Sequence, residues 1–382
     1  MVILVTHGLV KGNYEHNNPS SALKNLLEKE NIPFVLIKHS LSTGIFSNAF
    51  YGMGAKKGTT DVLISLNIKS DLLKYISDFL TTVISVVIMK IKYKEEIIFL
   101  GIDPLNATSG IVLKFLNIVN KTIFFSVDYT PNRFQNRLMN CIYQFLDRHC
   151  SLKSDEVWNV STRIVNMRLA NGIDKRKVFF IPNVPSQEYR NFSNNKKEKF
   201  HFISLGLLSG QLDYEGLFLA LKELVIDYPE ILLKIVGTGD YENKYKTLVK
   251  DLHLEKNVVF TGLLNHEDAL KEISLSGVGL ALYNGSWDFN YYGDSMKCRE
   301  YLFYGLPVLT TDTHSTVEEI RDYQAGIIVK LDPKEYVSGL KEILINYDFY
   351  STNSFELGRK YDNVRRDNLL RLLSLRRDNL RH

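Results

Sequence analysis

The stretch GDSMKCREYLFYGLPVL, residues 293–309, predicts a loop, a short helix and a buried strand in succession. Asp294 and Ser295 are suitable helix N-caps, Gly305 is a usual C-terminal stop, and Pro307 prevents the helix from continuing. We therefore expect a helix that starts near Ser295 and ends just before Gly305. An apolar strand follows it, so this stretch indicates an alternation of helix and strand.

Short apolar runs of the same kind recur along the whole chain, separated by stretches that are long enough for a helix. In the first half they are VILVTH, FVLIKH, DVLISLN, EIIFLGID, TIFFSVD, EVWNVS and VFFIPN; in the second half they are FHFISLG, LLKIVG, NVVFTG, VGLALY, LPVLTT and AGIIVKL. Continuous apolar strands that alternate with helices indicate parallel sheets buried on both faces. The predicted fold class is therefore α/β.

One polar, charged segment, SQEYRNFSNNKKEK at 186–199, has no apolar periodicity and is the best linker candidate. A chain of 382 residues also exceeds the roughly 250–300 residues at which single cores stop growing. We expect an N-terminal Rossmann-like domain at 1–185, a C-terminal Rossmann-like domain at 200–350 and a helical, basic tail at 351–382. Two such doubly wound domains would face each other across a cleft and bind ligands beyond the carboxyl ends of their strands.

Composition excludes several other classes of protein. Hydrophobic residues make up 45% of the chain and charged residues 24%, as in globular proteins, and a net charge of +4 is too mild to indicate nucleic-acid binding. The three cysteines form no CxxC pair, which favours a reducing cytoplasm over a disulfide framework. The chain opens on a strand pattern without a signal peptide, and the longest apolar run, 79–89, is too short to cross a bilayer.

The end of the chain has a different pattern. The pentamer RRDNL occurs at 365–369 and again at 376–380, and six arginines lie between residues 365 and 381. This segment is either a basic amphipathic helix at the inner face of a membrane or, as we favour, a helix that packs across the domains with a solvated basic edge. Both interpretations stay open at this point.

The helix that starts near Ser295 carries two charged residues three positions apart. A helix start offers backbone N–H groups to an anion, and Lys297 adds a formal positive charge that suits a diphosphate. Glu300 lies one turn further on the same side, where a carboxylate can accept two hydrogen bonds from a vicinal diol such as a ribose. The alternative is an ordinary Lys/Glu helix pair.

The run KCREYLFYGLPVLTTD, which begins at Lys297, resembles the signature helix of GT-B glycosyltransferases of the group 1, or family 4, type. The resemblance implies a retaining, nucleotide-sugar-dependent enzyme. It also implies that Ser295, Met296 and Lys297 bind the diphosphate and that Glu300 binds the ribose. The run LKIVGTGDYE resembles a glycine turn of the family, which places three residues near the nucleotide: Gly237, Thr238 and Gly239.

The sequence departs from the pattern of this family in two places. Tyr292 stands where the family usually has a first glutamate, so the nearest carboxylate, Asp294, becomes a catalytic candidate. Leu207 follows Gly206 where the family has an arginine, and the lysine of that loop is missing too. Glycosyl transfer is accelerated by fixed positive charge at the departing diphosphate, so Lys297 would be a catalytic residue that carries more of this charge.

The first half of the chain offers further candidates. In the family, a glycine-rich loop after the first strand reaches into the cleft, and Gly12 matches it. Asp128 ends the strand of FFSVDYTPNRF, where the family commonly has a His or Asp that faces the reacting sugar or acceptor; it is either a catalytic acid or a cap of the turn. Asp103 and Asn106 of GIDPLNATSG carry the same ambiguity.

The predicted function is that of a hexosyltransferase-type enzyme that moves a sugar from a nucleotide-diphosphate sugar to a saccharide or lipid-linked acceptor in cell-surface polysaccharide or glycan assembly. The nucleotide sugar is a substrate, so no cofactor is expected. The sequence shows no DxD suited to a metal–diphosphate site and no His spacing typical of metal ligands, so we expect no metal. The alternatives are a non-catalytic GT-B subunit that binds a glycan or partner enzyme, and a GT-B nucleotide-sugar epimerase.

Overall fold

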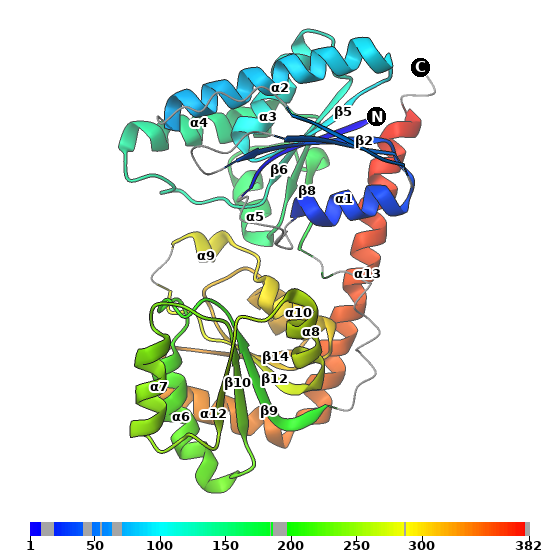
Figure 1. Cartoon of the computed structure of the whole chain (residues 1–382). Helices are drawn as coiled ribbons and strands as arrows, with labels where there is room; N and C mark the ends of the chain where they lie inside the picture. Colours follow the sequence, from blue (N-terminus) through cyan, green and yellow to red (C-terminus); the bar gives the residue numbers. More distant parts are fainter. Residues whose placement is uncertain are drawn as a thin grey trace. The chain divides into compact units, whose positions relative to one another are not determined.

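The computed structural model of the chain describes residues 1–8, 19–40, 48–53, 56–62, 71–183, 185, 197–285 and 288–378. The chain divides into two compact units: unit 1 comprises Met1–Pro182 and Asp367–His382, and unit 2 comprises Asn183–Arg366. Each unit is a sheet flanked by helices (Figure 1). The predicted α/β class is confirmed.

Unit 1 has an eight-stranded sheet with the order β4-β3-β2-β1-β5-β6-β7-β8. The strands are β1 (Val2–Gly8), β2 (Phe34–Ser40), β3 (Asn48–Met53), β4 (Lys56–Val62), β5 (Ile98–Ile102), β6 (Lys121–Ser126), β7 (Glu156–Asn159) and β8 (Val178–Phe180). All neighbours pair in parallel except β2 with β3 and β3 with β4, which are antiparallel. This hairpin was not expected from the sequence, because NAFYGM and KKGTTDV lack the continuous apolar run of a buried parallel strand.

The helices of unit 1 are α1 (Pro19–Lys29), α2 (Asp71–Tyr93), α3 (Pro104–Phe115), α4 (Arg137–Lys153) and α5 (Thr162–Ala170), with a 3₁₀ turn at Lys175–Lys177. Figure 1 shows α2, α3 and α4 on one face of the sheet and α1 on the other. The core under α2 and α3 is built from strand residues such as Ile3, Val35 and Phe99, which pack against Val86 and Leu113.

Unit 2 has a parallel six-stranded sheet with the order β11-β10-β9-β12-β13-β14. The strands are β9 (Glu198–Leu205), β10 (Leu232–Val236), β11 (Val258–Gly262), β12 (Ser276–Ala281), β13 (Val308–Thr311) and β14 (Gly326–Val329). The helices are α6 (Tyr214–Asp227), α7 (Glu242–Asp251), α8 (His266–Leu275), α9 (Asp288–Tyr292), α10 (Met296–Phe303), α11 (Val317–Asp322), α12 (Pro333–Ile345) and α13 (Tyr347–Asp378). Every apolar run predicted as a strand in this half of the chain forms one.

The strand order of unit 2 defines a topological switch point. From β9 the chain moves to β10 and β11 on one side, and then returns to β12 on the other side of β9. The connections after β9 and β12 therefore diverge, and ligands of doubly wound sheets bind at the carboxyl ends of two such strands. Helix α10, which connects β12 to β13, begins at this end of the sheet.

The last helix, α13, belongs to unit 2 as far as Arg366 and to unit 1 from Asp367. In unit 2, Tyr361 is fully buried and the hydroxyl of Ser354 donates to the carbonyl of Ala325 at 2.8 Å. In unit 1, the guanidinium of Arg371 donates to both carboxylate oxygens of Glu156 at 2.7 and 2.9 Å. One arginine of the basic segment therefore binds a carboxylate of unit 1.

Candidate functional site

Lys297, in the first turn of α10, lies across the ends of the two strands that flank the switch point. Its Nζ lies 5.0 Å from the centre of the Tyr283 ring, just beyond β12. Its Cε lies 3.1 Å from the position that a Cβ on Gly206 would take, just beyond β9. The predicted diphosphate-binding residue is thus placed where ligands bind in a doubly wound sheet.

The start of α10 presents unused hydrogen-bond donors. Ser295 caps the helix: its Oγ accepts from the N–H of Cys298 at 3.3 Å and lies 2.9 Å from the hydroxyl of Tyr283. Within the described part of the chain, the N–H groups of Met296 and Lys297 make no hydrogen bond. Free N–H groups at a helix start, together with an ammonium group beside them, form an anion-binding site.

Glu300 lies one turn beyond Lys297 and is 8% exposed. Burial raises the pKa of its carboxyl to about 7, although the nearby charge of Lys297 lowers it. Among the described residues the carboxyl makes no hydrogen bond. A buried carboxylate without partners is costly, so a ligand that offers hydroxyl groups would be favoured here.

Asp294 occupies a different environment from Lys297 and Glu300. Its side chain is fully buried and forms an ion pair with Arg299, whose Nε lies 2.9 and 3.1 Å from the two carboxylate oxygens. The hydroxyl of Thr316 and the backbone N–H of Asn183 donate to the same carboxylate at 2.9 and 2.7 Å, and Arg299 also binds Glu319 at 2.5 Å. Asp294 therefore holds the segment before α10 in place, and its catalytic role stays a prediction.

The glycine turn after β10 lies against the loop that Lys297 crosses. Gly237 has a φ of +140°, and a Cβ on it would lie 2.0 Å from the carbonyl oxygen of Gly206. A Cβ on Gly239 would lie 2.5 Å from the carbonyl oxygen of Leu208, whose N–H donates to the carbonyl of Thr238 at 3.0 Å. The turn therefore packs backbone against backbone and sets the position of the Gly206 loop beneath Lys297.

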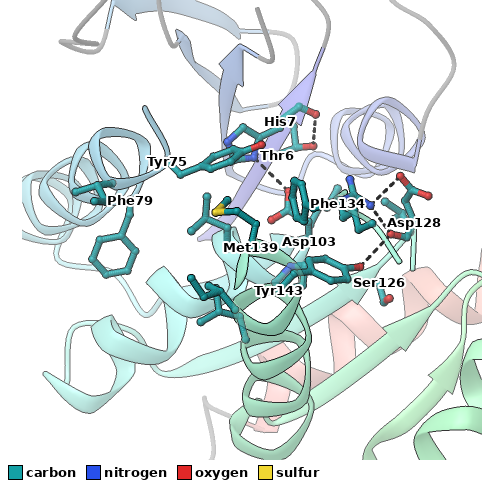
Figure 2. A pocket seen from close by; sticks show the side chains of 18 of the residues that line it. Thr6, His7, Tyr75, Phe79, Asp103, Ser126, Asp128, Phe134, Met139 and Tyr143 are labelled. Carbon is teal, nitrogen blue, oxygen red and sulfur yellow. Dashed lines mark hydrogen bonds and ion pairs between the residues drawn. The ribbon is translucent and has the colours of Figure 1, made fainter. Parts of the chain in front are cut away.

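Unit 1 contains a cavity of about 400 Å³ at the carboxyl ends of β1, β5 and β6, between α2 and α4 (Figure 2). Polar side chains from the strand ends contribute to its lining: Thr6, His7, Asp103, Ser126 and Asp128. Apolar and aromatic side chains form the rest of its walls, among them Tyr75, Ile76, Phe79, Phe134, Met139, Ile142 and Tyr143. Such a cavity suits a ligand with one polar end and one apolar end.

Asp128 lines this cavity and is 56% exposed at its side chain. Nη1 of Arg133 lies 3.1 Å from the Asp128 carboxylate and also donates to the Asp128 carbonyl at 2.8 Å. The two interpretations of Asp128 are compatible here, because the carboxylate closes the turn and still faces the cavity. Gly12 lies outside the described residues.

Sequence reasoning missed His7, which lines the cavity at the end of β1. Its Nδ1 lies 3.2 Å from Asp103 and its Nε2 lies 3.3 Å from Asp78, which also accepts from Lys74 at 2.6 Å. Burial alone would lower the pKa of His7, but the hydrogen bonds to Asp103 and Asp78 outweigh it and raise the pKa to about 9. At neutral pH the cavity therefore contains an imidazolium beside the carboxylate of Asp103. The sequence feature that could have identified this residue is a histidine at the end of a buried strand.

Solved structures similar to this chain cover both of its units. Sucrose-phosphate synthase from Thermosynechococcus elongatus is similar, with a TM-score of 0.66 and 14% identity over 99% of this chain and 98% of that one. Anabaena Alr3699/HepE in complex with UDP and glucose is similar, with a TM-score of 0.65 and 13% identity over 98% of this chain and 99% of that one. These likenesses define the class of the fold, which is GT-B.

The sequence comparisons match parts of the chain. Residues 185–354, within unit 2, match the model of the glycosyl transferases group 1. The uncharacterized glycosyltransferase MJ1059 of Methanocaldococcus jannaschii is 29% identical over 150 residues, which are 39% of this chain and 34% of that protein. The chain therefore spans about a third of the curated relative that it matches. The chain therefore has a GT-B fold, and its second half, residues 185–354, is similar to the glycosyl transferases group 1.

Proposed function

We propose that the chain transfers a sugar from a nucleotide-diphosphate sugar to an acceptor hydroxyl group. The observation that carries the proposal is the start of α10, where two unused N–H groups, the Lys297 ammonium and the buried Glu300 carboxyl lie within two turns. The first three groups suit a diphosphate and the fourth suits the ribose of its nucleotide. Binding of UDP and glucose by the similar Anabaena protein supports this choice of donor.

In the proposed reaction, the bond between the anomeric carbon and the diphosphate oxygen breaks while the acceptor oxygen bonds to the same carbon. Negative charge grows on the departing diphosphate, and fixed donors aimed at that charge lower the barrier. Lys297 and the N–H groups of Met296 and Lys297 supply these donors. The acceptor proton leaves on the departing phosphate or on a carboxylate at the acceptor site, and protein groups carry the charge without a metal. Retention of configuration, expected from the family resemblance, is part of the proposal.

We assign the acceptor to the cavity of unit 1. Its polar end contains the His7 imidazolium with Asp103 and Asp128, which can bind and orient hydroxyl or phosphate groups. Its apolar walls fit a hydrocarbon or another apolar group attached to the acceptor. A lipid-linked saccharide combines both features, and it would place the enzyme in cell-surface polysaccharide or glycan assembly at the inner face of the membrane.

A second function, that of a non-catalytic subunit that binds a glycan or partner enzyme, is an alternative that rests on one feature of the sequence. Leu207 and Tyr292 occupy positions where the family usually has a basic and an acidic residue. A nucleotide-sugar epimerase is a further alternative, because it would use the same donor site.

Isothermal titration of the purified chain with a panel of nucleotide-diphosphate sugars, followed by an assay for nucleotide release, tests these functions. We expect one nucleotide sugar to bind and to release its nucleotide, faster when an acceptor is added. Binding followed by conversion to an epimeric sugar would indicate the epimerase. A folded chain that neither binds nor cleaves any member of the panel would favour the binding subunit.

A further inference from the structure

The outer face of α2 is apolar, although it points away from the protein. Along the helix, six apolar residues recur at spacings of three or four and are between 49% and 70% exposed: Leu73, Ile76, Leu80, Ile84, Ile88 and Ile91. Residues at this spacing lie on one side of a helix. From the first to the last, the row is about 27 Å long at 1.5 Å per residue.

The inner side of α2 carries buried polar residues beside its apolar core contacts such as Val86. Ser77, Asp78, Thr82 and Ser85 are all buried, and the imidazole of His39 lies 2.7 Å from the Thr82 hydroxyl. A helix at the surface of a globular protein normally buries its apolar side and exposes its polar side. Single exposed apolar residues are common, but a row along a whole helix marks a binding surface.

The neighbouring helices of the same layer extend this surface. Helix α3 contacts both α2 and α4, and Figure 1 shows the three on one face of the sheet. Phe115 at the end of α3 is 86% exposed, and α4 exposes further apolar side chains: Leu138, Ile142, Phe145 and Leu152. We call the exposed apolar side chains of α2, α3 and α4 the outer apolar face.

The exposed charges that the structure describes on α2 and α4 are basic, whereas Glu95 and Glu96 are exposed just beyond the end of α2. Both acidic side chains that the structure describes on α2 and α4, Asp78 and Asp147, are buried in ion pairs, with Lys74 and Arg168 respectively. Beyond the end of α2, Glu95 lies 3.3 Å from the backbone nitrogen of Met1. The basic side chains that reach the surface on these two helices are Lys90, Lys92, Arg137, Arg148 and Lys153.

The outer apolar face is continuous with the cavity of unit 1. Ile76 of α2 and Ile142 of α4 line the cavity and are also 49% and 40% exposed. A molecule that lies against the outer apolar face can therefore reach the cavity along apolar side chains. This continuity distinguishes the face from an unrelated contact surface elsewhere on the chain.

We propose that the outer apolar face docks unit 1 onto the surface of a membrane that contains anionic lipid. The apolar row would lie in the interface, parallel to the membrane, while the surrounding lysines and arginines contact lipid headgroups. An acceptor carried by a lipid would then enter the cavity from the membrane side. This inference rests on the proposed function for the acceptor only, because docking itself needs no donor or reaction.

The test measures cosedimentation of the full chain with vesicles of phosphatidylcholine and phosphatidylglycerol at 3:1, without nucleotide sugar. We expect the wild type to bind and the double variant Ile84→Glu/Ile88→Glu to bind at least tenfold more weakly. The matched control is Ile226→Glu/Ile345→Glu, at unit 2 positions that are 78% and 71% exposed, and it should bind as the wild type does. The variant Ile84→Gln/Ile88→Gln makes the same positions polar without adding charge. Circular dichroism compares the folding of both variants with that of the wild type.

Further measurements distinguish a membrane from other partners of the outer apolar face. Lys90→Gln/Lys92→Gln should weaken binding to these vesicles severalfold and reduce its dependence on salt. A wild type that ignores the vesicles, or an Ile84→Glu/Ile88→Glu variant that binds them fully, would overturn the proposal. The proposal would also be overturned if the wild type is a dimer and Ile84→Glu/Ile88→Glu converts it to monomers without loss of vesicle binding. It would likewise be overturned if vesicle binding is lost only in the variant Arg376→Gln/Arg377→Gln. None of these results bears on nucleotide release, which tests the transferase separately.

Discussion

The side chain of Lys297 crosses Gly206 so closely that a Cβ there would lie 3.1 Å from the Lys297 Cε. The glycine at the end of β9 therefore leaves the space in which the lysine of α10 lies. The two positions are far apart in the sequence, and the sheet brings them together because β9 pairs with β12 at the switch point. In the proposed reaction, the group that would meet the leaving diphosphate is thereby fixed before any ligand binds, as electrostatic stabilisation of a transition state requires.

Lys297→Met should slow nucleotide release about 10²–10³-fold while the dissociation constant for the nucleotide sugar changes much less. The reason is that negative charge on the diphosphate increases as the bond to the sugar breaks, so the ammonium contributes more in the transition state than in the bound state. Single-turnover kinetics with separate binding measurements provide the check. Lys222→Met, at an exposed position of α6, is the control and should be neutral. A fall in affinity that equals the fall in rate would make Lys297 a binding residue only.

Glu300→Gln should weaken binding of a nucleotide sugar by about 1.5–3 kcal/mol, because an ionised acceptor is lost from the ribose diol. The wild type should also show pH-dependent affinity. Its Glu300 has a pKa of about 7, so below pH 7 the carboxyl is protonated and must lose its proton to accept both hydroxyl groups. Affinity should therefore rise with pH up to about 7 and level off above it.

Titration calorimetry from pH 5.5 to pH 8 measures this profile, and a nucleotide sugar is the right ligand because its bridged diphosphate does not titrate in this range. The Gln variant should give a flat profile. Glu267→Gln, at an exposed position of α8, should retain the wild-type profile. If the Gln variant keeps both the affinity and the slope, Glu300 does not contact the ribose.

The fold of unit 2 could be predicted from the sequence because its strands pair in parallel and each contains a short apolar run. The start of α10 was readable because Ser295 caps it through a local contact with Cys298. The antiparallel hairpin β3–β4 could not be predicted from the sequence, because an edge strand such as KKGTTDV is polar and contains no apolar run.

The environment of single side chains was much harder to predict. The sequence predicts a catalytic role for Asp294, the acid nearest to the missing glutamate, and it does not predict the partners of this side chain. These are Thr316 and Arg299, and Arg299 also binds Glu319. His7 meets Asp78 and Asp103, which lie about 70 and 100 positions away. A local sequence pattern does not predict these long-range contacts, because they depend on how the parallel strands and their helices are arranged in the sheet.

Asp294→Asn should lower the free energy of unfolding of unit 2 by about 3–5 kcal/mol, since it leaves Arg299 buried with less compensating charge. Urea unfolding followed by circular dichroism provides the measurement. Asp227→Asn is the matched control: Asp227 pairs with Lys341 at an exposed position, so its loss should cost about 1 kcal/mol or less. If Asp294→Asn is as stable as the wild type but inactive, the residue has the catalytic role that the sequence predicted.

Asp78→Asn should lower the pKa of His7, because one of the two carboxylates that hold the imidazolium would be neutral. The sign for stability follows from the raised pKa. A histidine whose pKa is about 9 in the folded chain and 6.5 when unfolded stabilises the fold fully below pH 6.5, and this contribution is lost as the pH rises through 9. The variant should therefore lose more stability at pH 6 than at pH 10.

An NMR titration of the His7 ring measures the pKa directly, and unfolding at pH 6 and pH 10 measures the linked stability. Asp155→Asn removes a half-exposed carboxylate that binds Lys114 and should leave the His7 titration unchanged. If His7 in the wild type titrates near 6.5, its imidazole is neutral at physiological pH, and the cavity of unit 1 lacks the positive charge that we assign to the acceptor end.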